Sequence, residues 1–145
     1  MKHTSRNYIK LEFPSTGANE SLARSAVAAL AAQLDPTLDE LGDIKTAVSE
    51  AVTNAIVHAY PDRIGTVWLR ASILDGDVLE LTVRDRGRGI ADVAQAMQPL
   101  YTTGGEERSG MGFTIMESFT DALRVRSTPG KGTTVTMRRR IRKKR

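Results

Sequence analysis

The chain has 145 residues, of which 40% are hydrophobic, and this length suits one domain with a sizeable buried core. It contains no cysteine, which excludes a disulfide framework and a thiolate metal site. No apolar run is long enough to span a membrane, and no hydrophobic segment typical of a signal peptide begins the chain. We therefore expect a globular, cytoplasmic protein.

The net charge of +4 comes from the last eight residues, because the segment 138–145 is basic at every position except Ile141. Such a segment can bind nucleic acid or an acidic partner. It has no interleaved aromatic residues for base stacking, however, so we expect a solvated, frayed terminus. The sequence predicts a single domain over residues 1–137, followed by this basic tail.

The first half of the chain predicts one strand and two helices. Apolar and polar residues alternate between Ile9 and Phe13, as in a short strand. A helix capped by Asn19 follows and ends at Asp35–Pro36. Thr37-Leu-Asp-Glu40 is a capping box, and it opens a longer helix whose apolar stripe extends to Ala59.

The second helix carries three polar side chains at steps of four residues: Glu50, Asn54 and His58. Glu50 lies opposite the middle of the apolar stripe, and the other two approach the edge of that stripe. The row therefore flanks the core. It either lines a cleft or faces solvent.

Two strands are expected at 66–73 and 78–85, joined by a hairpin turn. Asp85 ends the apolar row of the second strand, where a carboxylate is costly unless something donates a hydrogen bond to it. After a short helix at 92–97, the segment 98–110 predicts a mobile loop that contains Gly104–Gly105.

The chain is expected to end with a helix after Gly112 and with strands at 123–126 and 133–137. The element order β-α-α-β-β-loop-α-β-β favours an α+β fold. In this two-layer α/β sandwich, helices cover one face of a mixed, mostly antiparallel sheet.

Two glycine motifs could carry chemistry. Asp85 is followed by Gly87 and Gly89, and Gly110-Met-Gly112 opens a helix whose free N–H groups suit phosphate oxygens. Either motif alone also fits an ordinary turn. The P-loop, the dinucleotide fingerprint and the common protein-kinase motifs are absent, and two histidines without cysteine make a zinc site improbable.

In combination, Glu50-x-x-x-Asn54, Asp85-x-Gly87-x-Gly89, Gly110-x-Gly112 and Gly132-Thr-Thr134 resemble the ATP-binding boxes of the gyrase, Hsp90, histidine-kinase and MutL superfamily, which has the Bergerat-type fold. Within it, the chain most resembles the bacterial anti-sigma factor/serine kinase family, and its sporulation branch in particular. The resemblance covers nearly the whole chain. Its most specific stretches are QLDPTLDELGDIKTAVSEAVTNAIVHAY and ERSGMGFTIMESF.

This resemblance implies ATP and Mg²⁺ as cofactors. Asn54 would ligate Mg²⁺ through its amide oxygen, and Glu50 would be the general base that takes a proton from the attacking hydroxyl. Asp85 would accept a hydrogen bond from the adenine amino group, and Thr134 would help to hold the adenine. Gly87 and Gly89 would let the backbone pass close to the nucleotide.

Residues 91–110 would form an ATP lid, in which Arg108 contacts the γ-phosphate and orders the lid. The phosphates would meet the backbone of Ser109, Gly110, Met111, Gly112 and Phe113. Gly104–Gly105 departs from the more charged lid sequence that the family leads us to expect. His58 either reaches the phosphate region or packs beside the cleft, and the sequence leaves both open.

The implied function has two parts. The protein would bind and inhibit a sigma factor of the sigma F type, and it would phosphorylate a serine of the anti-anti-sigma factor, with Arg24 contacting both partners. A homodimer is implied as well, with no membrane and no direct nucleic-acid contact.

Three alternatives stay open. They are a stress-response regulator of the sigma B type, an ATP-gated binding module without phosphotransfer, and a nucleic-acid binder that acts through the tail. Glu50 distinguishes the kinase from the binding module, because a pure binder needs no base.

Overall fold

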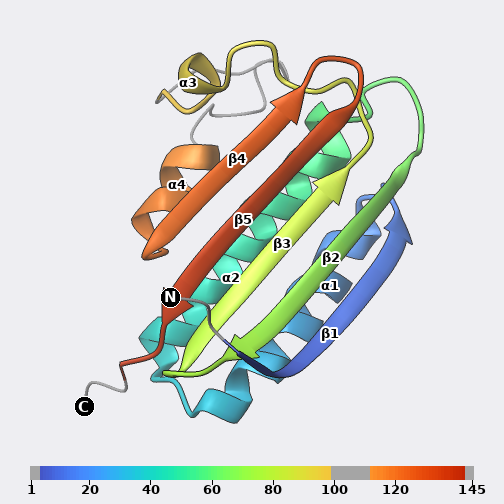
Figure 1. Ribbon diagram of the computed structural model, residues 1–145. Coiled ribbons are helices and arrows are strands. Elements are labelled where there is room, and N and C mark those ends of the chain that lie inside the picture. The colour runs from blue at the N-terminus through green and yellow to red at the C-terminus, as the bar shows by residue number, and fades with distance from the viewer. Residues whose placement is uncertain (1–3, 99–111, 143–145) are drawn as a thin grey trace.

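The computed structural model describes residues 4–98 and 112–142. Its helices and strands follow one another along the chain as Figure 1 shows, with β1 first and β5 last. Their bounds are β1 (Ser5–Pro14), α1 (Ala18–Ala31), the 3₁₀ turn η1 (Ala32–Leu34), α2 (Leu38–Thr53), the π-helical turn η2 (Asn54–His58), β2 (Thr66–Leu74), β3 (Val78–Asp85), α3 (Val93–Ala96), α4 (Gly112–Ser118), β4 (Ala122–Thr128) and β5 (Gly132–Arg140).

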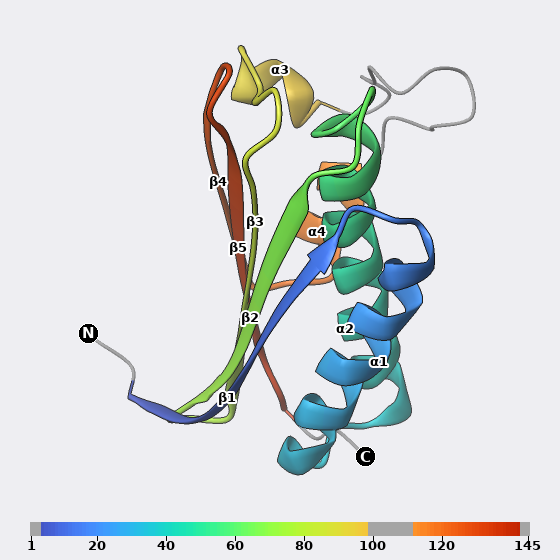
Figure 2. The same cartoon turned by 90° about the vertical axis from the view of Figure 1, so that its right-hand side faces the viewer.

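The strands form one sheet in the order β1-β2-β3-β5-β4, and every pair of neighbours in it is antiparallel. In the side view of Figure 2, α1, α2 and α4 cover one face of this sheet. The two-layer α+β architecture is therefore confirmed. The expected sheet was mixed, but among the described strands no parallel pair occurs. Nor is any helix in the described part of the chain long and apolar enough to cross a membrane.

The core lies between the two layers, because each strand turns alternate residues towards the helices. The side chains at its centre are less than 2% exposed, and burying each of them contributes about 1.5–3 kcal/mol. The largest of these are Leu69, Met116, Met137, Val27, Val48, Val52, Val67 and Val83.

The helix starts follow the sequence signals with one exception. Thr37 forms the expected capping box with Glu40, and Asp35 ends η1 in the left-handed region at φ 52°. Asn19, however, is not the cap of α1, because the helix starts earlier, after Gly17. The Asn19 side chain instead donates a hydrogen bond to the Pro14 carbonyl oxygen at 3.0 Å, which ties α1 to the end of β1.

The basic C-terminal segment is ordered further than expected. The last strand runs on to Arg140, and Ile141 is 4% exposed in the core. Arg139 Nη1 lies 2.9 Å from Asp43 Oδ2, and the backbone N–H of Arg142 donates to the buried Glu40. The expectation of a frayed end is therefore wrong for residues 138–142, because the Arg139 side chain and the Arg142 backbone find partners on α2 and Ile141 is buried in the core.

Candidate functional site

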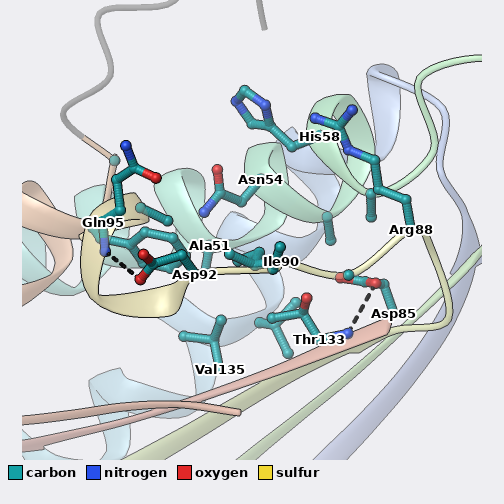
Figure 3. A pocket seen from close by; sticks show the side chains of 18 residues that line it. Ala51, Asn54, His58, Asp85, Arg88, Ile90, Asp92, Gln95, Thr133 and Val135 are labelled. Atoms are coloured by element: carbon teal, nitrogen blue, oxygen red, sulfur yellow. Dashed lines mark hydrogen bonds between the residues drawn. The ribbon is translucent and has the colours of Figure 1, made fainter. Parts of the chain in front are cut away.

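A cavity of about 340 Å³ opens at the end of the sandwich, between the helix layer and the ends of β3 and β5 (Figure 3). Polar side chains enter it from both layers, Asn54 from the helix side and Asp85 from the sheet side. Its remaining walls are largely small or apolar. The lining residues are Ala51, Asn54, Ala55, His58, Ala59, Val83, Asp85, Arg88, Gly89, Ile90, Ala91, Asp92, Gln95, Ala96, Gly112, Phe113, Thr133 and Val135.

Asp85 is the buried acid of this cavity, with 7% of its surface exposed. Its Oδ1 accepts hydrogen bonds from the backbone N–H groups of Gly87, at 2.9 Å, and Thr133, at 3.2 Å. Burial raises the pKa of the carboxyl above its ordinary value, and these two bonds only partly oppose that rise. Both hydrogen bonds within the described residues end on Oδ1, so Oδ2 is the atom that can accept a bond from a ligand.

Asn54 and His58 lie at the two ends of a turn in which the second helix changes its pitch. From Asn54 to His58 the chain forms a π-helical turn, in which the Ala59 N–H donates to the Asn54 carbonyl oxygen at 3.2 Å. Such widened turns occur frequently at functional sites. Both side chains line the cavity, as does Arg88 from the loop after β3.

Glu50 and Asn54 meet the start of α4 at Gly112. A Cβ atom on this glycine would lie 3.3 Å from Glu50 Oε2 and 3.7 Å from Asn54 Oδ1. The carboxylate and the amide oxygen therefore face the same small space, which the missing side chain keeps open. Oxygen donors of these two kinds suit a hard cation such as Mg²⁺. Across the described residues, no group of three His, Cys, Asp or Glu side chains is arranged to hold a metal by itself.

The glycines after β3 are required by neighbouring backbone. A Cβ on Gly87 would lie 2.1 Å from the Ala59 carbonyl oxygen. Gly89 has φ +75°, and its Cβ would lie 2.2 Å from the Thr128 carbonyl oxygen. Gly89 lines the cavity, whereas Gly87 packs against the end of η2. Close packing of protein against protein thus accounts for both residues before any ligand is considered.

Residues that the sequence did not single out hold this loop in place. The Tyr60 hydroxyl accepts a bond from the Arg86 N–H and donates one to the Thr66 carbonyl oxygen, both at 2.7 Å. Ser127 accepts from the Ile90 N–H at 2.7 Å, which fastens the loop to β4. A buried tyrosine directly after the polar row of the second helix was the available signal for the first of these contacts.

Thr134 does not line the cavity, so that expectation is corrected by one residue. Side chains alternate along β5, and Thr133 and Val135 point into the cavity. Thr134 belongs to the opposite face of the sheet, where it lines a second depression. The alternation of the buried Val135 and Met137 already carried this information.

Arg24 lies on α1, outside the cavity. Its Nη1 is 3.5 Å from both Glu20 Oε2 and Ser49 Oγ, and Ser49 in turn donates to Glu20 at 3.1 Å. Arg24 therefore contacts Ser49, the residue that precedes Glu50 on α2, within the helix layer. Phe113 and Gly112 line the cavity, whereas Arg108, Ser109, Gly110 and Met111, with lid residues 99–110, lie outside the described residues.

Comparison with known proteins adds a family context to this geometry. Residues 13–139 match the family model described as "Histidine kinase-like ATPase domain". The chain is 59% identical over 136 residues to an anti-sigma F factor of Caldanaerobacter subterraneus subsp. tengcongensis, with 93% of this chain and 94% of the relative covered. It is 57% identical over 142 residues to an anti-sigma F factor of Halalkalibacterium halodurans, with 95% of both chains covered.

Two solved structures illustrate the likeness of the fold. The RsbU and RsbW domains of Rv1364c from Mycobacterium tuberculosis match 93% of this chain with a TM-score of 0.69 at 20% identity, and this chain spans 32% of that one. A blue-light activated histidine kinase of Erythrobacter litoralis matches 81% of this chain with a TM-score of 0.59 at 26% identity, and 40% of that chain is covered.

Proposed function

Because the chain belongs to the histidine kinase-like ATPase family and, within it, to the anti-sigma F factors, we propose that it inhibits a sigma factor of the sigma F type by binding it. We further propose that it is an ATP-dependent serine kinase that phosphorylates and inactivates the anti-anti-sigma factor. The observation that carries the proposal is the joint placement of Glu50 and Asn54 beside Gly112, at one side of the cavity that contains Asp85.

Each described residue has a role in this proposal. Asp85 accepts the adenine amino group at Oδ2, while Gly87 and Thr133 hold its other oxygen. Thr133, rather than Thr134, is the threonine of β5 that faces the base. The loop anchored by Tyr60 fixes the position of this end of the cavity.

Phosphoryl transfer is assigned to the other end of the cavity. Asn54 Oδ1 would help to hold Mg²⁺, which supplies charge neutralisation at the phosphates. Glu50 takes the proton of the attacking serine hydroxyl, since its Oε2 faces the same space beside Gly112. Positioning and electrostatic stabilisation supply most of the catalysis in such transfers, so no covalent intermediate on this chain is required. Arg108 and the backbone of residues 109–113 remain our proposal for the γ-phosphate contacts.

Two further parts of the proposal follow from the partners rather than from the cavity. Arg24 contacts the sigma factor and the antagonist from α1, and the protein acts as a homodimer. Since a sigma factor works on the bacterial chromosome, we place this activity in the cytoplasm.

The experiment is transcription by an RNA polymerase that carries the sigma F type factor, with increasing amounts of this protein and either ATP or ADP. We expect inhibition that is stronger with ATP, and relief of inhibition when the unphosphorylated antagonist is added. Arg24→Gln should weaken the inhibition while ATP binding stays the same. A transcription rate that the protein does not change at any concentration of ATP or ADP would contradict the proposal.

A further inference from the structure

The face of the sheet that points away from the helices carries a concentration of positive charge. In the side view of Figure 2, none of the described helices covers this face. The strand registers place one residue from each strand in a continuous row across it. From β1 to β4 this row reads Glu12, Trp68, Arg84, Thr134 and Arg126.

A depression of about 230 Å³ lies at this row, on the far side of β3 and β5 from the ATP cavity. Four cationic side chains line it, together with the hydroxyl groups of serine and threonine residues. The cations are Arg84, Arg86, Arg126 and Lys131, the hydroxyl residues are Ser127, Thr128, Thr133 and Thr134, and Asp85 and Gly132 complete the lining.

No ion pair within the described residues engages any of these four cations, although other arginines of the chain are paired. On the same face, for example, Arg138 binds Glu80 at 2.7 Å. The acid that ends the row, Glu12, accepts a hydrogen bond from Trp68 Nε1 at 2.9 Å. Asp85 is the one carboxylate residue among the described residues of the lining, and it is buried, with its Oδ1 accepting hydrogen bonds from the Gly87 and Thr133 N–H groups. Four cations thus face one carboxylate with which none of them forms an ion pair, and this excess of positive charge favours an anionic ligand.

The aromatic ring beside the depression holds two of these cations in position. The guanidinium carbons of Arg84 and Arg86 lie 4.6 Å and 5.2 Å from the centre of the Trp68 ring. Such contacts restrict the guanidinium groups, whose N–H groups can still donate to carboxylate oxygens. They also occupy the ring, so Trp68 offers little surface for stacking a nucleic-acid base.

We propose that this depression is a docking site for an acidic segment of a partner protein, whose aspartate and glutamate carboxylates bind Arg84, Arg86, Arg126 and Lys131. Charge complementarity favours such a segment over a second copy of this chain, because face-to-face copies would oppose like charges. The four cations lie outside the ATP cavity, although Asp85 and Thr133 line both hollows, so the proposal does not depend on the function proposed above.

The test measures binding of a fluorescein-labelled decapeptide of alternating Glu and Gly by fluorescence anisotropy at low salt. A Gln-Gly decapeptide and a labelled ten-residue oligothymidylate are measured beside it. The double variant Arg84→Gln/Arg126→Gln should bind the acidic peptide about tenfold or more weakly, because two charge contacts are removed. Lys131→Gln should also weaken binding of the acidic peptide. Because Lys131 lies in the turn between β4 and β5, this substitution leaves the sheet unchanged.

The matched control is Arg6→Gln/Arg138→Gln, which removes the same charge from two exposed arginines that are already paired. We expect its affinity to stay within about twofold of the wild type. An equal loss in both double variants would overturn the proposal, because bulk charge would then explain the binding. So would tighter binding of the oligothymidylate through the same arginines, a changed oligomeric state of Arg84→Gln/Arg126→Gln, or no binding of the acidic peptide.

Discussion

The substitution Asp85→Asn separates the two oxygens of this carboxyl group. The asparagine Oδ1 can still accept the bonds from the Gly87 and Thr133 N–H groups, so the loop after β3 keeps its anchors. The atom that changes is Oδ2, for which we propose the contact to the adenine; it becomes an NH₂ group and therefore a donor. The adenine amino group is a donor as well, so the two groups cannot form a hydrogen bond.

The expected loss of ATP affinity follows from that single contact. A hydrogen bond to a charged group contributes about 1.5–3 kcal/mol, which corresponds to roughly a 10- to 150-fold change in dissociation constant. Discrimination should change together with affinity. The wild type should prefer ATP strongly over inosine triphosphate, which lacks the amino group, and Asp85→Asn should lose most of that preference.

Asp85→Asn should not lower the free energy of unfolding, although it lowers the affinity for ATP. The pKa of Asp85 is raised in the folded protein, chiefly by burial, so the folded state binds more protons than the unfolded state between pH 3.8 and the raised pKa. The free energy of unfolding therefore falls as pH rises through that window, and the penalty persists above it. Asp85→Asn removes this titration, so at pH 7 the variant should be at least as stable as the wild type.

Calorimetric titration with ATP and inosine triphosphate, together with urea unfolding at pH 7 and pH 5, measures both effects. Asp62→Asn is the matched control, because Asp62 is an exposed acid outside the cavity. An Asp85→Asn protein that is folded and binds ATP within about threefold of the wild type would refute the assignment of Asp85 to the base.

Four further changes test other parts of the account. Glu50→Gln should leave ATP affinity nearly unchanged and slow phosphoryl transfer by about 10²–10⁴-fold. Single-turnover kinetics measure this rate, with Glu117→Gln as the control. An unaffected rate would exclude Glu50 as the base. Gly87→Ala places a Cβ against the Ala59 carbonyl and should cost about 1–3 kcal/mol in urea unfolding, whereas Gly17→Ala, with open space around it, should cost far less. Tyr60→Phe removes the hydroxyl that joins Arg86 to Thr66 and should cost about 1–3 kcal/mol, with weaker ATP binding; a fully stable variant would contradict its anchoring role. Truncation after Arg142 should leave the melting temperature unchanged, whereas truncation after Met137 should lower it sharply, because it removes the buried Ile141 and the Arg139–Asp43 pair.

Much of the fold could be predicted because its signals are local. Alternating apolar residues defined β2 and β3 to within a residue, and the capping box at Thr37 fixed the start of α2. The errors occur where contacts between residues far apart in the sequence determine the structure. The sequence around Arg139 does not indicate that Asp43 is its partner. The sequence therefore predicts a frayed chain end, whereas in the fold the two residues form an ion pair.

The candidate site was predictable in kind but not in detail. The spacing of Glu50 and Asn54 fitted either a cleft or a solvent-exposed flank, and only the fold brings Gly112 against both of them. The π-helical turn at Asn54 has no clear sequence signal, so the direction of His58 could not be derived from a regular helix. The shift from Thr134 to Thr133 was avoidable, since strand alternation alone decides which residue faces the cavity.

The central claim is that this cavity binds ATP and transfers its γ-phosphoryl group to a serine of the antagonist. The most direct measurement incubates the protein with γ-labelled ATP, Mg²⁺ and the anti-anti-sigma factor, and locates the label by mass spectrometry. The account predicts label on one serine of the antagonist, lost with Glu50→Gln and with replacement of that serine. Tight ATP binding without any labelled antagonist would contradict it.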